Sequence, residues 1–348
     1  MLKGVGLLYK AVTLIFVSTT IAVSGYSQEC ALKLQDAQAQ FDRGKVELVA
    51  GMITPCLNSG SFSREESLTA YKLLIQSLLL DDKQAMAEEY MLEFLSRHPE
   101  YSVTAADYSG FVYLRNKYEV RQSCLISLFL GTNYTFLTGR NHRSLSSLEP
   151  DINYSREPLN LYAGTEVTIP VRSLFSLSAG ISYSSVAFNY NEHMMNFGMV
   201  TYRESQNRIE IPLSVVWNAA DYRGVRLYVR GGAGYAMNLK TDSKASFITT
   251  DINNGFNRTG ENLNRNSSRI RSDLFIHAGL GGMIKIPHGY ISAEIRTLFG
   301  LRNQVVRSEP GNLEYYYFYT DDSFRVNTTG LTIGYTYIFY KPSRRSGS

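Results

Sequence analysis

The chain has 348 residues, enough for about two domains at roughly 150 residues each, and its 44% hydrophobic and 19% charged residues exclude intrinsic disorder. Its 3 cysteines are too few for a disulfide-rich mini-protein. After the first thirty residues no stretch approaches the ~18 continuous apolar residues of a membrane helix, which excludes a helical channel or transporter.

The first segment, residues 1–27, has the pattern of a secretory signal peptide. Lys3 and Lys10 precede an apolar run from Ala11 to Val17, and small or polar residues follow up to Ser27. We expect cleavage just before Gln28. An uncleaved anchor helix and lipidation at Cys30 are the lesser alternatives.

Export would place the three cysteines in an oxidising environment, where disulfides persist. Cys30 and Cys56 flank one predicted helical hairpin and could be bridged across its open end, which leaves Cys124 over. None of the three has a His or Cys at metal-ligand spacing, so we expect no zinc site.

Residues 28–122 form an acidic helical module, with 10 basic and 14 acidic residues against 23 basic and 17 acidic in residues 123–348. This change in charge indicates a domain boundary near Gln122. Apolar residues at helical spacing predict two antiparallel helix pairs, and Ser63 with Glu66 forms the capping pattern of the second pair. The basic residues of the second part do not cluster, so no nucleic acid is expected as a partner.

The second helix pair resembles a tetratricopeptide unit. Tyr71, Leu74, Ala87 and Pro99 fall at that repeat's spacing, whereas Ile75 stands where the repeat has a small residue. The resemblance implies a protein-docking surface, for which we take Tyr71, Leu74, Tyr90 and Phe94 as the candidate face. The alternative is a small helical cap without a ligand.

From Leu125 the hydrophobic period changes from 3.6 to 2, which predicts β-strands. Eight segments share the pattern, and longer connections alternate with short turns, as in outer-membrane barrels. The fold class predicted is an eight-stranded antiparallel transmembrane β-barrel over residues 123–340, with a short tail at 341–348. The strands are expected at about 125–136, 158–170, 174–190, 199–217, 225–239, 272–286, 289–301 and 328–340.

The two faces of these strands differ in polarity. One face is almost free of charge, with Leu161, Val167, Leu177, Ile181, Ile211, Leu213, Val215, Leu227, Val229, Ile276, Leu280, Ile291, Ile295, Leu331 and Ile333. A soluble barrel would bury that face, but charges confined to the other face favour a polar lumen and a lipid-facing exterior. The predicted lumen network consists of Glu166, Arg226, Arg230, His277, Lys285, Glu294 and Arg296.

Two stretches carry a family resemblance. Arg208-Ile209-Glu210-Ile211-Pro212-Leu213 and the segment from Val225 to Tyr235 resemble the PorT-like outer-membrane β-barrel family of Bacteroidetes, over roughly residues 123–340. The resemblance implies the barrel fold and the bacterial outer membrane. It implies no catalytic motif.

Catalytic motifs for hydrolases, zinc proteases and phosphate binding are absent. His277 could meet Ser182 or Ser292 inside a barrel, but packed lumen residues are the simpler interpretation. The segment from Lys240 to Arg271 is expected to be a mobile polar loop. The aromatic run from Tyr315 to Tyr319 is expected in the outer girdle, the alternative being an exposed binding patch.

The sequence therefore favours a non-enzymatic outer-membrane barrel that anchors a periplasmic docking module and displays surface loops, without a cofactor. Its expected partners are outer-membrane lipid and a periplasmic or membrane protein. A lipid-modifying barrel enzyme and an accessory of a secretion machinery are the alternatives.

Overall fold

The computed structural model describes residues 29–141, 152–156, 160–194, 197–222, 224–249, 257–306, 312–319, 321 and 323–345. The predicted signal peptide and its cleavage site lie outside them. The chain divides into two compact units. One extends to Arg121 and includes the segment from Tyr340 onward, and the other is Gln122–Phe339. Among the described helices, none is long and apolar enough to cross a membrane.

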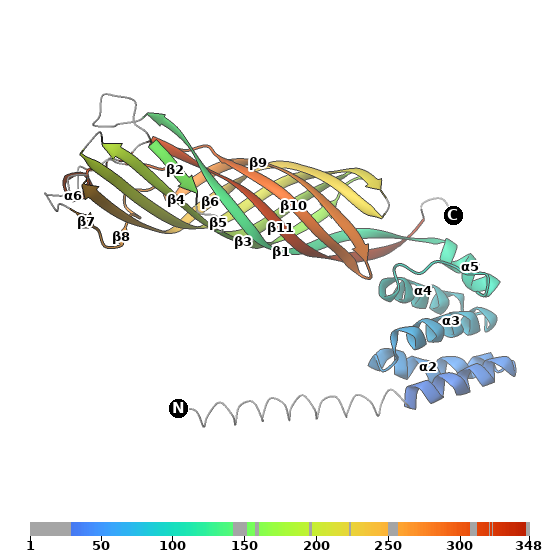
Figure 1. Cartoon of the computed structure of the whole chain (residues 1–348). Helices are drawn as coiled ribbons and strands as arrows, with labels where there is room; N and C mark the ends of the chain where they lie inside the picture. The colour runs from blue at the N-terminus through green and yellow to red at the C-terminus, as the bar shows by residue number, and fades with distance from the viewer. Residues whose placement is uncertain are drawn as a thin grey trace, which may run out of the picture. The chain divides into compact units, whose positions relative to one another are not determined.

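The first unit consists of antiparallel helices packed in chain order (Figure 1). Residues 29–42 form the first helix, followed by α2 (Val46–Ser59), α3 (Arg64–Leu80), α4 (Gln84–Arg97) and α5 (Ser109–Asn116). α2 contains Pro55, continues to Ser59 and ends at the left-handed Gly60 (φ 65°).

Local sequence explains where α3 begins. The Ser63 hydroxyl accepts a hydrogen bond from the Glu66 amide, and the Glu66 carboxylate accepts one from the Ser63 amide at 2.8 Å. This reciprocal capping satisfies two amide donors that have no partner within the helix. A disulfide joins Cys30 to Cys56, with their Cα atoms 5.8 Å apart, and ties the first helix to α2. Cys124 is a free cysteine.

The second unit is a closed antiparallel barrel, and the predicted fold class is confirmed. Within the described residues, eight long strands pair in the ring order β1-β3-β4-β5-β6-β9-β10-β11 and back to β1 (Figure 1). The short strands β2 (Ile152–Arg156), β7 (Arg258–Thr259) and β8 (Leu263–Asn264) pair with β4 or β6. The ring strands are β1 (Tyr118–Asn141), β3 (Asn160–Pro170), β4 (Phe175–Met194), β5 (Gly198–Tyr222), β6 (Val225–Thr249), β9 (Ser272–Ile286), β10 (Gly289–Gly300) and β11 (Ser323–Arg344).

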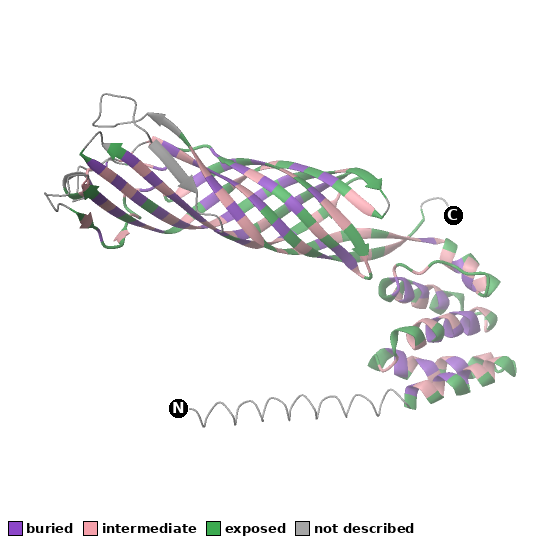
Figure 2. Cartoon of the chain, in the orientation of Figure 1, coloured by how far each residue is buried: buried purple, intermediate pink, exposed green. Residues whose placement is uncertain are grey.

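The outward face of the barrel is the apolar one. Burial alternates residue by residue along the strands (Figure 2), and all fifteen residues predicted for the exterior are exposed, from 39% at Val229 to 66% at Ile333. A sheet that turns its charged side chains inward and its Leu, Ile and Val side chains outward is suited to lipid, not to water.

Several strands are longer than the sequence predicts. β5 and β6 have 25 residues each, and β6 continues to Thr249, so the expected mobile loop from Lys240 to Arg271 is wrong in its first part. The sequence did not indicate a strand there because outward residues such as Lys240, Asp242 and Lys244 are polar, so the alternation of apolar and polar residues is lost. The helix α6 (Asn312–Tyr317), β7 and β8 lie at this end of the barrel, here called the loop end; the opposite end, with the tight connections at 171–174 and 287–288, is called the turn end (Figure 1).

Candidate functional site

The barrel interior contains a compact network of four charged side chains from β3, β6 and β10. Arg230 bonds the Glu166 carboxylate at 2.5 Å, and Arg296 bonds Glu294 at 2.6 Å. Two further ion pairs cross between them, Arg296 to Glu166 at 2.7 Å and Arg230 to Glu294 at 3.1 Å. Two arginines and two carboxylates thus neutralise one another, and all four are buried.

Aromatic side chains complete this layer. The Tyr228 hydroxyl donates to Glu294 at 2.7 Å, and Arg296 donates to the Tyr162 hydroxyl at 3.3 Å while lying 5.5 Å from the centroid of the Phe129 ring. The Tyr228 ring lies over Gly281, where an added Cβ would be 2.4 Å from it. Glycine on β9 therefore makes room for the tyrosine, and the layer fills the cross-section.

The other three residues predicted for the lumen network do not join it. Arg226 bonds Asp221 at 3.0 Å and the Tyr290 hydroxyl at 3.3 Å near the turn end. Lys285 is exposed close to the turn after β9. His277 is buried, but its hydrogen-bond contacts are with Ser214 and the Leu213 carbonyl instead of the network. The prediction placed them together because alternation along a strand shows which face a side chain lies on. It does not show how far along the barrel axis the side chain lies.

A second buried network, which the sequence analysis missed, lies toward the loop end. Arg269 binds Glu204 at 2.7 Å and Asp321 at 2.8 Å, and Arg265 also contacts Asp321. Tyr202 donates to Glu204 at 2.5 Å. One feature of the sequence could have identified the β5 members of this network. Polar residues occur there at every second position, namely Glu204, Gln206, Arg208 and Glu210. Arg269 and Asp321 come from outside the strands, where no periodicity identifies them.

An apolar cluster fills the barrel interior at the loop end. Tyr319 stacks on Tyr202 with ring centroids 3.8 Å apart, and Phe318 packs against Phe247 at 5.0 Å. The expectation that the aromatic run belongs to the outer girdle is therefore wrong for Tyr319, which is 6% exposed. We call this cluster the loop-end plug. Its buried members are Val186, Phe188, Tyr190, Val200, Tyr202, Ala245, Phe247, Leu313, Tyr319, Phe324 and Val326.

Within the described barrel interior, one histidine–serine contact is present, and it joins residues that the sequence did not pair. The His277 Nε2 atom is 3.3 Å from the Ser214 hydroxyl, while Ser182 and Ser292 hydrogen-bond carbonyls of Glu210 and Gly334. His277 Nδ1 has no hydrogen-bond partner among the described residues, so no carboxylate orients the ring. Both side chains are buried. Nor does the described part of the chain hold three or more metal-ligating side chains in one group.

In the helical unit, the predicted docking residues are mostly core. Tyr71, Leu74 and Phe94 are 0% exposed, and Tyr90 packs against the same cluster. The prediction of a docking face at these positions is wrong, because a helix pair buries its tetratricopeptide-like positions against neighbouring helices. The exposed apolar side chains lie elsewhere, with Leu48 at 47% and Met86 at 44%.

An ion pair between a partly exposed lysine and a buried carboxylate fixes the segment before α5. Lys72 Nζ lies 2.6 Å from the Asp107 carboxylate, which also accepts from the Tyr101 hydroxyl at 2.5 Å and the Thr104 amide at 2.7 Å. Burial alone would raise the pKa of Asp107, but the bonds from Lys72, Thr104 and Tyr101 outweigh it and lower that pKa to about 2. These contacts, called the Lys72–Asp107 clamp below, join α3 to the 101–107 segment.

Together, the closed ring, the apolar exterior and the charged interior define an integral outer-membrane β-barrel. The outer membrane protein beta-barrel domain family matches residues 119–306, and the chain belongs to this family. No curated protein matches the sequence.

Several solved structures are similar. Ail, the attachment invasion locus protein of Yersinia pestis, is 13% identical over 62% of this chain and 99% of its own, with a TM-score of 0.27. Neisserial surface protein A is 11% identical over 62% of this chain and 97% of its own, with a TM-score of 0.30. OprG from Pseudomonas aeruginosa is 7% identical over 64% and 98%, with a TM-score of 0.29.

Proposed function

We propose that this protein is a non-enzymatic outer-membrane β-barrel that anchors a periplasmic helical module for protein docking and displays surface loops. The observation that carries the proposal is the filling of the described barrel interior. The central network and the loop-end plug consist of buried side chains that bond or pack against one another. Such a barrel serves as an anchor, which leaves the helical unit and the loops to provide function.

The non-enzymatic part rests on the interior chemistry. A lipid-modifying barrel needs a histidine and a serine within reach of each other at the lipid boundary. The His277–Ser214 contact is instead buried, and the Nδ1 atom of the ring has no partner among the described residues. This geometry supports a structural role for the pair.

For docking, we propose an edge formed by the second helix of each pair. Leu48 and Met86 are the third residues of α2 and α4, so they occupy equivalent positions in the two pairs. Both are exposed, although apolar side chains of that size contribute more when buried. The occupant would be a periplasmic or membrane protein that covers this edge.

The resemblance of the Arg208–Leu213 and Val225–Tyr235 segments supports a finer assignment to the PorT-like group of Bacteroidetes. The Lys3-to-Ser27 pattern supports a cleaved leader, which N-terminal sequencing of the mature protein tests by giving Gln28 first.

The docking proposal is tested in two steps. Removal of residues 31–120, with the leader retained, should leave a barrel that resists alkaline carbonate extraction and shows heat-modifiable gel mobility, because closed strand ladders need no hydrogen bonds from the helices. The same deletion should abolish capture of the periplasmic partner. If the truncated barrel fails to insert, the helices belong to its folding unit.

The second step locates the surface in the full chain. Leu48→Asp with Met86→Asp should weaken partner capture by about tenfold or more, as expected when contact residues at an interface centre are lost. Leu80→Asp is the matched control, since Leu80 is 59% exposed at the end of α3. Equal loss in the control, or undiminished capture by the double variant, would remove this edge from the proposal.

A further inference from the structure

Glu210 on β5 differs from the carboxylates of the two charged networks. On the strand it lies between Val216, the register partner of Arg230, and Glu204 of the second network. The carboxylates of those networks form ion pairs with arginine, as Glu204 does with Arg269 at 2.7 Å. Glu210 is 3% exposed and has no ion pair among the described residues. A buried charge without a partner is strongly unfavourable, so another group must balance it.

The side chains of Asn133 and Ser184 connect to the Glu210 carboxylate. The Asn133 amide nitrogen donates to the Ser184 hydroxyl at 2.9 Å, and this hydroxyl in turn donates to Glu210. Asn133 is 3% exposed and Ser184 is 0% exposed. Three ring strands, β1, β4 and β5, therefore meet in one chain of buried hydrogen bonds.

Two oxygen atoms of this chain have no hydrogen-bond donor among the described residues. They are Glu210 Oε2 and Asn133 Oδ1. Both belong to side chains that bond the same Ser184 hydroxyl, so they lie in one small region of the interior. Buried polar atoms in proteins are nearly always satisfied by protein, water or an ion. Because both atoms are acceptors, they cannot satisfy each other and need a donor or a cation.

The charges around Glu210 favour a cation over a neutral donor. Arg208 is close enough to Glu210 and Asp273 to interact electrostatically with both. Its guanidinium donates to the side-chain oxygens of Gln206 at 3.0 Å and Gln304 at 3.2 Å. Asp273 accepts from the Gln304 side chain at 2.8 Å, which is a neutral donor. One arginine thus faces two buried carboxylates, and one negative charge remains unbalanced.

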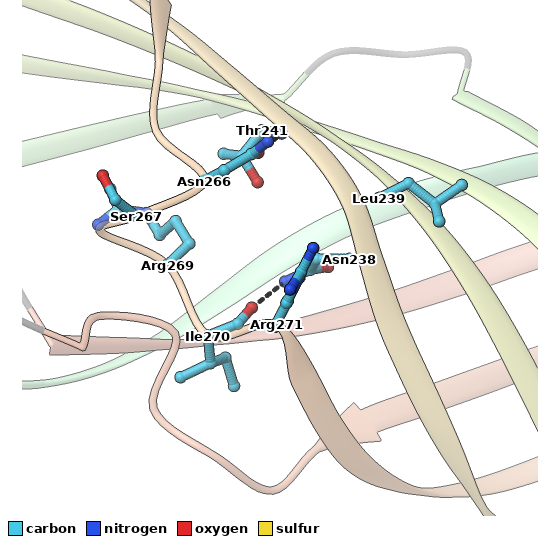
Figure 3. A pocket seen from close by; sticks show the side chains of 8 residues that line it. All are labelled: Asn238, Leu239, Thr241, Asn266, Ser267, Arg269, Ile270 and Arg271. Carbon is cyan, nitrogen blue, oxygen red and sulfur yellow. Dashed lines mark hydrogen bonds between the residues drawn. The ribbon is translucent and has the colours of Figure 1, made fainter.

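The next arginine toward the loop end, Arg269, is not available to supply the missing charge. It belongs to the segment 266–271, which lies beside β6 (Figure 3). Asn238 donates from its side-chain amide to the Ile270 carbonyl at 2.6 Å, the bond drawn in Figure 3, and so fixes this segment. The Arg269 guanidinium is bonded to two carboxylates of the second network. It would have to leave both of them to reach Glu210.

We propose that the barrel interior encloses a monovalent metal cation, such as sodium, bound by Glu210 Oε2 and Asn133 Oδ1. Carboxylate and carbonyl oxygens are ligands that such ions take in proteins. A single positive charge balances the one uncompensated carboxylate, whereas a divalent ion would leave the layer positive. The ion would tie β1 to β5 from the inside. This inference does not depend on the docking proposal.

The test uses the full-length chain, refolded from urea into detergent micelles with rubidium chloride as the probe and a chelator of divalent ions present. After desalting, elemental mass spectrometry should find a single rubidium ion retained per folded chain, because buried side chains enclose the site. Crystals of the same material should give an anomalous scattering peak beside Glu210 and Asn133. A folded chain that retains no rubidium would overturn the proposal, since a proton would then neutralise Glu210. A rubidium peak found only elsewhere would overturn it as well.

Three variants connect the retained ion to the two oxygens. Glu210→Gln keeps the shape of the side chain and removes its charge, so it should lower the retained rubidium at least about tenfold. Asn133→Ala keeps the charge and removes one ligand, and should also retain less than the native chain. Glu261→Gln, at an exposed glutamate outside the ring strands, is the matched control and should retain rubidium as the native chain does. Unchanged heat-modifiable mobility verifies that each variant is folded. Equal retention in folded Glu210→Gln and the native chain would refute the site.

Discussion

The two units of this protein bury opposite kinds of side chain. The helical unit buries Tyr71, Leu74 and Phe94 and leaves its described Lys, Arg, Asp and Glu residues at least partly exposed. The barrel buries Glu166, Arg230, Glu294 and Arg296 and exposes leucine, isoleucine and valine. The difference follows from the solvent, because lipid takes the apolar side chains and leaves polar groups to satisfy one another inside.

The comparison also shows why burial has a different meaning in each unit. In the helical unit a buried residue contributes mainly by leaving water. In the barrel interior a buried charge is tolerated only while its partners remain, since an isolated charge there is strongly unfavourable. The largest effects of mutation should therefore come from buried apolar residues in the helical unit and from buried charged residues in the barrel.

The largest effect is expected at the centre of the barrel network. Arg296→Met leaves Glu166 and Glu294 with one arginine between them, and should lower the free energy of unfolding of the barrel by about 3–5 kcal/mol. Urea unfolding in lipid vesicles, followed by the fluorescence of Trp217 on β5, measures this change. Arg172→Gln is the exposed control, for which we expect a change within about 0.5 kcal/mol. A loss below about 1 kcal/mol for Arg296→Met would contradict the network's role.

A second pair of variants compares the two exteriors directly. Ile295 on β10 is 55% exposed and Leu80 on α3 is 59% exposed, so the two differ mainly in their surroundings. Ile295→Arg should destabilise the barrel by about 2–4 kcal/mol, because an arginine there faces lipid. Leu80→Arg should change the helical unit by about 0.5 kcal/mol or less. Similar effects in both would mean that the barrel exterior is not in lipid.

The smallest effect concerns the clamp in the helical unit. The folded pKa of Asp107, about 2, lies below its unfolded value near 4, so its stabilisation is present above about pH 4 and is lost as the pH falls toward 2. We expect the native chain to lose about 1–2 kcal/mol more than Asp107→Asn over that range. Circular dichroism at 222 nm during unfolding follows the helices. Parallel losses in both chains would show that the clamp does not titrate as described.

The barrel was predictable because a period of two indicates β-strands, and charges confined to one face of those strands favour a polar lumen over a soluble fold. Ile291 to Ile295 on β10 and Leu331 to Ile333 on β11 keep that pattern, and each was placed on the correct face. The pattern fails toward the loop end, where the outward face gains polar residues and the inward face carries the apolar cluster, and the bulge at Leu239 reverses the parity of β6. The strand from Lys240 to Thr249 was therefore expected to be a loop.

Predictions about the interior were limited by long-range contacts. Glu166, Arg230, Glu294 and Arg296 were identified from strand parity, but parity does not give depth, so Arg226 and Lys285 were added to the same set. The Glu204–Arg269 pair joins residues 65 apart, one of which lies outside a strand. Tyr319 was assigned to the exterior because an aromatic run before a strand is typical of a girdle, whereas stacking on Tyr202 holds it inside.

The claim that the barrel interior is closed by packed side chains can be tested most directly by electrical recording. The purified full-length protein, inserted into planar lipid bilayers, should give no steady conductance above that of the bare bilayer, because an eight-stranded barrel has room only for its own side chains. Steady, porin-like conductance from the native chain would contradict the account, since ions would then pass the layer that Arg230 and Arg296 occupy.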